Sequence, residues 1–110
     1  MSGKRSRDKG ARGEREVRDL LRKYGYEAER GCQRAGGPDS PDVKALDFPF
    51  HIEVKRTEKI NVYDAFDQAK RDAGGPGEPP PIVFHKRNRR EWLVVMDAED
   101  LMRMLKYANA

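Results

Sequence analysis

Two short segments of the chain place carboxylates and a lysine at a spacing that suits metal-dependent chemistry. Asp42 is followed, eleven residues later, by the triplet Glu53-Val54-Lys55. In a β-strand, residues i and i+2 point to the same face, so Glu53 and Lys55 are expected to project together from one side. Ile52 and Val54, at the alternate positions, would face the core. If the segment that contains Asp42 pairs alongside, two carboxylates and one ammonium group converge.

This trio suits the hydrolysis of a phosphodiester. Mg²⁺ prefers near-octahedral oxygen coordination from one or two carboxylates, several waters and substrate phosphate oxygens. The ion would polarise the phosphate and lower the pKa of an attacking water, while Lys55 would orient that water or offset charge on the phosphorus. The alternative is an exposed sheet face with a solvated ion pair, and the spacing of Glu53 and Lys55 alone does not decide between the two.

The composition limits the classes of protein that the chain can form. Of 110 residues, 38% are charged and 36% are hydrophobic, which leaves a modest core for one domain, so a dimer interface is expected to contribute stability. Cys32 is the only cysteine, which excludes an intrachain disulfide, a thiolate zinc site and a CxxC redox pair. The apolar runs are too short for a membrane span or a secretory signal, which predicts a cytoplasmic protein with no membrane partner.

Positive charge is concentrated at the start of the chain. Residues 1–34 hold 11 Lys/Arg and 6 Asp/Glu, whereas residues 35–110 hold 12 and 13. Such an asymmetry favours a polyanion-binding segment, because Lys and Arg that neutralise phosphates release condensed counterions. A solvated basic tail would show the same pattern. Residues 1–8 lack apolar periodicity and are expected to form a disordered basic arm, with residues 9–110 as the folded domain.

The periodicity of apolar residues predicts three helices and five strands. In the first helix, over residues 9–24, Val17, Leu20 and Leu21 lie on one stripe that ends at Gly25. Five strands are expected, at 26–30, 42–46, 51–56, 82–86 and 91–96, with hairpin turns at 47–50 and 87–90. Two further helices are expected to follow the caps Asn61 and Asp97 and to run to about 73 and 107. Residues 31–41 and 74–81 are rich in Gly and Pro and are expected to be loops. This order predicts an α/β or α+β domain around one mixed sheet.

Three segments of the sequence resemble the PD-(D/E)xK nuclease superfamily, and in particular the archaeal and phage-type Holliday junction resolvases. They are Lys9-Gly10-Ala11-Arg12-Gly13-Glu14-Arg15-Glu16, Pro41-Asp42-Val43 and Glu53-Val54-Lys55. The resemblance implies a restriction-endonuclease-like single domain with a central mixed β-sheet flanked by helices. The sequence departs from the family pattern at residues 36–40, where its loop is longer than the loop of such resolvases.

The resemblance also implies roles for single residues. Asp42 and Glu53 would be the principal metal ligands, the backbone carbonyl of Val54 and the side chain of Glu14 would complete the shell, and Lys55 would be the catalytic lysine. The cofactor would be Mg²⁺, for which Mn²⁺ substitutes in such enzymes.

Basic residues that match or extend the resolvase pattern are the expected DNA contacts. Arg15 and one of Arg30 or Arg34 match basic positions of such resolvases. Gln68, on the helix after the lysine strand, would point to the active site or simply be exposed. The remaining candidates are Lys9 and Arg12 on the first helix and Lys86, Arg87, Arg89 and Arg90 in the second hairpin turn, which would either bind the phosphate backbone or keep the turn soluble.

Several further residues have ordinary structural interpretations. His51 and His85 have no second histidine at metal spacing and are expected in strand-surface or interior hydrogen-bonding roles. Trp92, Leu101 and Leu105, like Phe84, are expected in the core or a dimer contact.

The function that follows is a structure-specific DNA endonuclease. A four-way junction has approximate two-fold symmetry and needs two cuts, which a homodimer with one site per subunit would supply. A nuclease of the same fold that acts on forks, flaps or duplex DNA in phage genome processing would have the same active-site residues. A non-catalytic DNA-binding module would require a broken carboxylate-lysine set, and Glu14, Asp42, Glu53 and Lys55 are intact.

Overall fold

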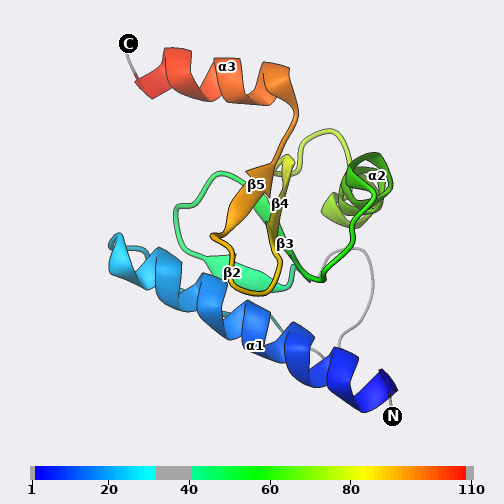
Figure 1. Ribbon diagram of the computed structural model, residues 1–110. Coiled ribbons are helices and arrows are strands. Elements are labelled where there is room, and N and C mark those ends of the chain that lie inside the picture. The colour runs from blue at the N-terminus through cyan, green and yellow to red at the C-terminus, as the bar shows by residue number, and fades with distance from the viewer. Residues whose placement is uncertain (1, 32–40, 109–110) are drawn as a thin grey trace.

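The computed structural model describes residues 2–31 and 41–108, apart from the side chain of Ser2 (Figure 1). The elements in chain order are α1 (Ser2–Lys23), β1 (Ala28–Arg30), β2 (Val43–Ala45), β3 (His51–Arg56), α2 (Val62–Ala73), β4 (Pro81–Lys86), β5 (Leu93–Val95) and α3 (Ala98–Ala108). They confirm the predicted order of helices and strands. Most of the loop expected at 31–41 lies outside the described ranges.

One mixed sheet organises the domain, as predicted. Its strands lie in the order β1-β2-β3-β4-β5. β3 and β4 pair in parallel, and each of the other neighbouring pairs is antiparallel. α2 is the connection that returns the chain for the parallel pair, whereas short turns join β2 to β3 and β4 to β5, which confirms both predicted hairpins.

α1 ends where the sequence predicts, at a glycine in the left-handed region. Gly25 has φ +93, and its N–H donates to the carbonyl of Arg22 at 3.0 Å, while the N–H of Tyr26 donates to the carbonyl of Leu21 at 3.0 Å. These two bonds form a Schellman motif, which satisfies carbonyls that the helix end leaves free. Tyr26 is half-buried against the core cluster that contains Leu21, so the motif also directs the chain into β1.

The start of α1 differs from the expectation of a disordered arm. The structure continues the helix back to Ser2, and residues 3–8 are exposed along it. Low hydrophobicity shows only that a segment has little to bury, whereas Lys and Arg are good helix formers and no proline interrupts this segment. The basic residues therefore extend α1 beyond the sheet.

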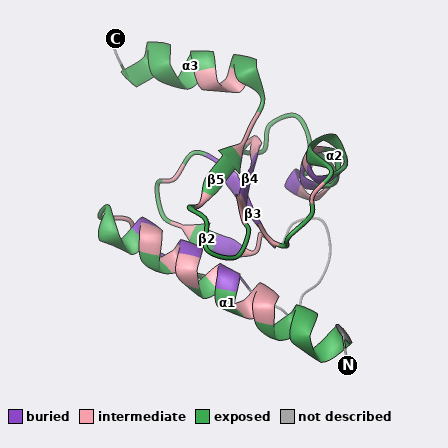
Figure 2. Cartoon of the chain, in the orientation of Figure 1, coloured by how far each residue is buried: buried purple, intermediate pink, exposed green. Residues whose placement is uncertain are grey.

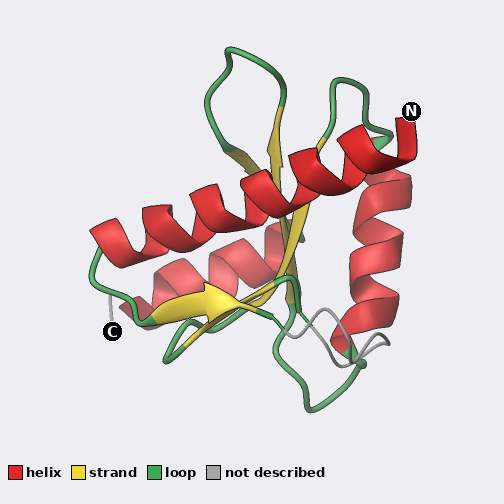
Figure 3. Cartoon of the chain, turned by 90° about the horizontal axis from the view of Figure 1, so that it is seen from below, coloured by secondary structure: helices red, strands yellow, loops and turns green. Residues whose placement is uncertain are grey.

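The two faces of the sheet are covered by different helices. Val17 and Leu21 of α1 pack with Ile52, Val54 and Phe84 in one buried cluster. Seen from below, α1 lies across the strands (Figure 3). The opposite face packs against α2 through three buried alanines, Ala65, Ala69 and Ala73. Figure 2 shows this burial concentrated on the central strands, so residues of β3 are enclosed on both sides.

Predicted caps begin the other two helices. The N–H of Asp64 donates to Oδ1 of Asn61 at 3.0 Å, and Oδ1 of Asp97 accepts from the N–H of Glu99 at 2.8 Å. α3 then extends from the end of β5, at the opposite end of the molecule from α1 (Figure 1). No helix among the described residues is long and apolar enough to span a membrane.

The close approach of α1 to β3 depends on Gly13 and gives a testable prediction. A Cβ added there would lie 2.9 Å from Cβ of Arg56 and 3.4 Å from Cη2 of Trp92, whereas a Cβ at Gly10 meets nothing within 4 Å. Gly13→Ala is expected to lower the free energy of unfolding by about 1 kcal/mol or more through overpacking. Gly10→Ala, the matched control, should raise it by about 0.5–1 kcal/mol. Urea unfolding followed by circular dichroism measures both, and equal stabilisation by the two changes would contradict this packing.

Candidate active site

The β2–β3 pairing brings Asp42 and Glu53 together, as the sequence predicts. Asp42 immediately precedes β2, and its N–H donates to the carbonyl of Ile52 at 3.0 Å. Its Oδ2 accepts a hydrogen bond from the N–H of Val54 at 2.8 Å. The Asp42 carboxyl is thereby fixed to the residue next to Glu53, and the two carboxyl groups are within hydrogen-bonding range of each other.

Glu53 is enclosed, which removes the alternative of a solvated ion pair on an exposed sheet face. It is 8% exposed, and its register partner on β4 is the fully buried Val83. Because Ile52 and Val54 face α1, Glu53 projects to the side that α2 covers. A carboxylate in such a position requires partners or a cation, since an isolated buried charge is costly.

The pKa of Asp42 is raised to about 7, first by burial and then by the hydrogen bond and the negative charge of Glu53. The charge of Glu14 acts in the same direction, whereas the N–H of Val54 lowers the pKa. The metal-free site therefore holds a proton that an ordinary aspartate would have lost. A divalent cation bound here would reverse this preference, because it favours the ionised carboxylates.

His51 contacts Glu53, although the sequence did not mark His51 as a residue of the site. Its ring is buried, and Nε2 lies 3.0 Å from Oε1 of Glu53. The sequence indicated a strand-surface or interior hydrogen-bonding role, and the structure shows the interior one. The i, i+2 spacing with Glu53 on one strand was the available signal. Hydrogen bonds of this kind orient a carboxylate that binds metal.

Glu14 pairs with Arg30, a residue that the sequence assigned to DNA contact. Arg30 Nε and Nη2 lie 3.0 and 2.8 Å from Oε1 of Glu14, and the Glu14 side chain is 12% exposed. This ion pair links α1 to β1 near Asp42. Arg30 therefore holds one of the candidate metal ligands in place.

Asp42 and Glu53 are the two carboxylates of the implied ligand set that lie together in the structure. Within residues 2–31 and 41–108, no group of three His, Cys, Asp or Glu side chains is arranged to hold a metal, so Glu14 is near the pair but does not join it in one cluster. Mg²⁺ needs one or two carboxylates, with waters and phosphate oxygens in the other positions. His51 and Val54 each hydrogen-bond to one oxygen of a carboxyl group, and a cation would replace the proton that the two carboxyl groups share.

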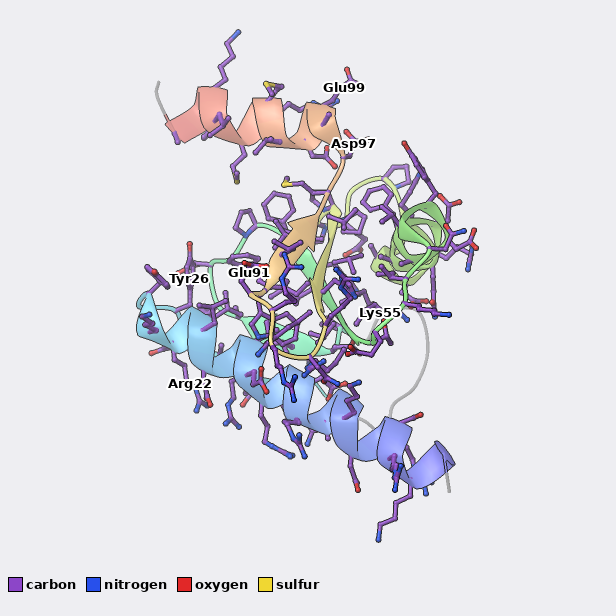
Figure 4. The ribbon with its side chains drawn as sticks, viewed as in Figure 1. Arg22, Tyr26, Lys55, Glu91, Asp97 and Glu99 are labelled. Atoms are coloured by element: carbon purple, nitrogen blue, oxygen red, sulfur yellow. The ribbon has the colours of Figure 1, made fainter. Side chains whose placement is uncertain are left out.

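Lys55 lies on the same side of β3 as Glu53 and is held by α2. Its Nζ donates to Oε1 of Gln68 at 3.1 Å, and Figure 4 shows Lys55 on the part of the sheet near α2. Gln68, predicted either near the active site or simply exposed, thus lies beside the lysine. The amide oxygen positions the ammonium group without neutralising its charge.

The predicted basic contacts divide into paired and exposed side chains. Lys9 pairs with Glu58 at 3.3 Å, Lys86 with Glu16 at 3.4 Å, and Arg90 with Glu91 at 3.1 Å. The exposed candidates are Arg12 and Arg15 on α1 and Arg87 and Arg89 in the β4–β5 turn. Arg34 lies outside the described residues.

Known proteins share both the sequence pattern and the fold. Residues 5–109 match the model of a family described as "Phage putative PDDEXK endonuclease". The structure is similar to that of Archaeoglobus fulgidus Hjc, a Holliday junction resolvase from an archaeal hyperthermophile, with a TM-score of 0.58 and 31% sequence identity over 80% of this chain and 72% of that chain. No curated protein sequence matches the chain. These matches confirm the resemblance and the restriction-endonuclease-like fold inferred from the motifs.

The raised pKa of Asp42 predicts how stability changes with pH. Because the folded-state pKa is about 7 against an ordinary 3.8, the folded chain holds more protons between these values, and this carboxyl lowers the free energy of unfolding as pH rises through them. In chelator, Asp42→Asn is expected to stabilise the protein at pH 8 by on the order of 2 kcal/mol. The gain should shrink toward pH 4, as urea unfolding at each pH would measure. A gain that is the same at pH 4 and pH 8 would rule out this carboxyl as its source.

Proposed function

Because the chain belongs to the phage PDDEXK endonuclease family, we propose that it is a Mg²⁺-dependent DNA endonuclease that resolves four-way (Holliday) junctions by paired symmetric nicks. The observation that carries the proposal is the convergence of Asp42 and Glu53 in an enclosed position, with Lys55 two residues further along the same strand face. The similarity to a Holliday junction resolvase of known structure supports the choice of substrate.

The residues of the site have distinct parts in this mechanism. Asp42 and Glu53 would hold Mg²⁺, with Glu14 and the carbonyl of Val54 as further ligands. The bound ion would supply a polarised phosphate and a water of lowered pKa. The ammonium group of Lys55 orients that water or offsets the negative charge that develops on the phosphate.

Three neighbours keep these groups in place. His51 holds one oxygen of Glu53, Arg30 holds one oxygen of Glu14, and Gln68 accepts from Lys55. Each bond joins a candidate functional side chain to a neighbouring side chain of the fold. Such fixed orientation lowers the reorganisation that the site needs when DNA binds.

DNA would be recognised by its branched shape and its phosphates. The exposed Arg12 and Arg15 of α1, and Arg87 and Arg89 of the β4–β5 turn, can contact the backbone without disturbing an internal ion pair. Phosphate contacts position a protein on DNA but carry no base sequence. A two-fold symmetric homodimer would present two sites to the two strands of a junction.

The family description favours one alternative, since it names a phage endonuclease without a substrate. Forks, flaps or duplex DNA that arise during phage genome processing would be cut by the same residues. The non-catalytic DNA-binding module is the weaker alternative, because the carboxylates and the lysine are all present and held together.

Cleavage of defined DNA substrates tests the proposed activity. Labelled four-way junction, fork and linear duplex are incubated with the protein in Mg²⁺ or in chelator. We expect paired symmetric nicks on the junction alone. Glu53→Ala should lower the rate more than about 100-fold, since even outer neighbours of a metal cost 10–100-fold. Glu78→Ala, an exposed glutamate in the α2–β4 loop, is the matched control and should cut normally.

Each other result has a definite meaning. Equal cutting of every substrate would indicate a general nuclease of this family and reject junction resolution. Binding without cutting in Mg²⁺ and in Mn²⁺ would reject catalysis. Cutting that survives Glu53→Ala would reject the site.

The role of His51 gives a separate prediction about metal affinity. His51→Phe removes the bond to Glu53 and should raise the Mg²⁺ concentration for half-maximal cleavage by about 10–100-fold, with the rate at saturating Mg²⁺ less affected. His85→Phe is the control, because His85 lies on β4 and contacts the carbonyl of Thr57 at 2.9 Å. A loss of maximal rate without a change in the Mg²⁺ requirement would argue against a positioning role.

A further inference from the structure

The turn between β4 and β5 holds an arginine in a backbone conformation that favours glycine. The N–H of Arg90 donates to the carbonyl of Arg87 at 3.2 Å, so Asn88 and Arg89 are the central residues of the turn. Arg89 has φ +61, in the left-handed region where the Cβ of an L-residue crowds its own backbone. Glycine would avoid this cost, and a second asparagine would lessen it. Strained residues of this kind cluster at functional sites, where the surrounding structure holds them in place.

Three hydrogen bonds fix this turn to the strand that carries Lys55. The side chain of Arg56, the next residue of β3, is 8% exposed. Its Nη2 donates to Oδ1 of Asn88 at 2.9 Å, and its Nη1 donates to the carbonyl of Lys86 at 3.3 Å. Oε2 of Glu58 accepts from the N–H of Asn88 at 2.8 Å. The turn is therefore attached to the residues that directly follow the candidate catalytic lysine.

α1 completes the attachment of the turn. Nζ of Lys9 lies 3.3 Å from the same oxygen of Glu58. Oε1 of Glu16 accepts from Nζ of Lys86 at 3.4 Å and from Nε1 of Trp92 at 3.1 Å. Figure 1 shows the β4–β5 turn beside α1. Because α1 also carries a candidate metal ligand, the turn and the candidate active site form one connected unit.

The fixed turn presents an exposed cation. Arg89 is exposed, and it makes no ion pair within residues 2–31 and 41–108, whereas Arg90 pairs with Glu91 at 3.1 Å. A strand of DNA offers phosphates at regular intervals, about 3.4 Å apart along the helix axis. Contact with one of them fixes the register of a protein on the backbone. A cation at a constant distance from Lys55 would therefore determine which phosphodiester reaches the active site.

We propose that the β4–β5 turn sets the position of the cut. Arg89 binds a backbone phosphate at a constant offset from the scissile bond, and Glu58 and Arg56 are positioning residues that keep this offset constant. This role of the turn rests on the proposed function, because it needs a cleavage reaction, and it adds the choice of the bond that is cut. The strained backbone at Arg89 distinguishes this residue from an ordinary exposed arginine.

Mapping the cuts at nucleotide resolution tests the role of the turn. On a labelled four-way junction in Mg²⁺, the unchanged protein is expected to cut each cleaved strand at one dominant phosphodiester. Glu58→Ala releases the turn and Arg89→Gly removes its contact, so both should move a substantial share of the cuts to neighbouring phosphodiesters. Arg89→Lys keeps a cation at the tip and should retain the dominant position. Glu78→Ala, at the exposed glutamate of the α2–β4 loop, is the matched control for Glu58→Ala and should also retain it.

Thermal unfolding without DNA or metal tests the strain independently. Arg89→Gly should raise the unfolding temperature by about 4 °C, because glycine adopts a positive φ without steric cost. Arg90, the next residue of the turn, has no positive φ, so Arg90→Gly should bring no such gain. A variant that gains stability and loses cleavage precision is the result expected of a residue that is kept for its side chain.

The outcomes separate this role from the proposed function. Scattered cuts by the unchanged protein, or cuts at the same dominant position by Arg89→Gly or Glu58→Ala, would overturn the role of the turn and leave the nuclease function standing. An unfolding temperature that Arg89→Gly lowers or leaves unchanged would show that Arg89 is not strained and would overturn it as well. An unchanged protein that cuts no DNA would reject the proposed function, and the position of a cut with it.

Discussion

The site depends on one hydrogen bond in which a side-chain oxygen takes the place of a backbone carbonyl from a neighbouring strand. Where the β2–β3 pairing ends, the N–H of Val54 is satisfied by Oδ2 of Asp42 instead of by a backbone carbonyl. This bond fixes a carboxylate to β3 at the residue beside Glu53, in surroundings from which water is largely removed. The position of Asp42 is therefore set by the backbone of the sheet and not by side-chain flexibility. Both the chemistry and the instability of the metal-free site follow from this constraint.

Around that pair, each further charge has its own partner from a different part of the fold. Glu14 on α1 pairs with Arg30 on β1, and Lys55 on β3 is held by Gln68 on α2. These contacts connect helices on both faces of the sheet to the same place. The arrangement offsets part of the cost of gathering like charges, because each group is bonded before any cation or phosphate arrives. Preorganisation and folding stability therefore rest on the same hydrogen bonds.

The features of the fold that depend on a few neighbouring residues could be predicted from the sequence. Gly25, Asn61 and Asp97 marked helix ends, and the alternation around Glu53 gave the strand and its two faces. Pairings between distant residues could not be predicted, because they depend on how helices dock on the sheet. Arg30, one of two arginines considered for a DNA contact, pairs with Glu14, and nothing in the sequence indicated that pairing. Low hydrophobicity was also a poor guide to residues 2–8, since helix formation there needs no core.

The edges of the sheet have a consequence for behaviour at high concentration. β1 and β5, the outer strands, are three residues long. A short edge offers few unpaired N–H and C=O groups on which another chain could add a strand, so growth of the sheet into fibres is disfavoured.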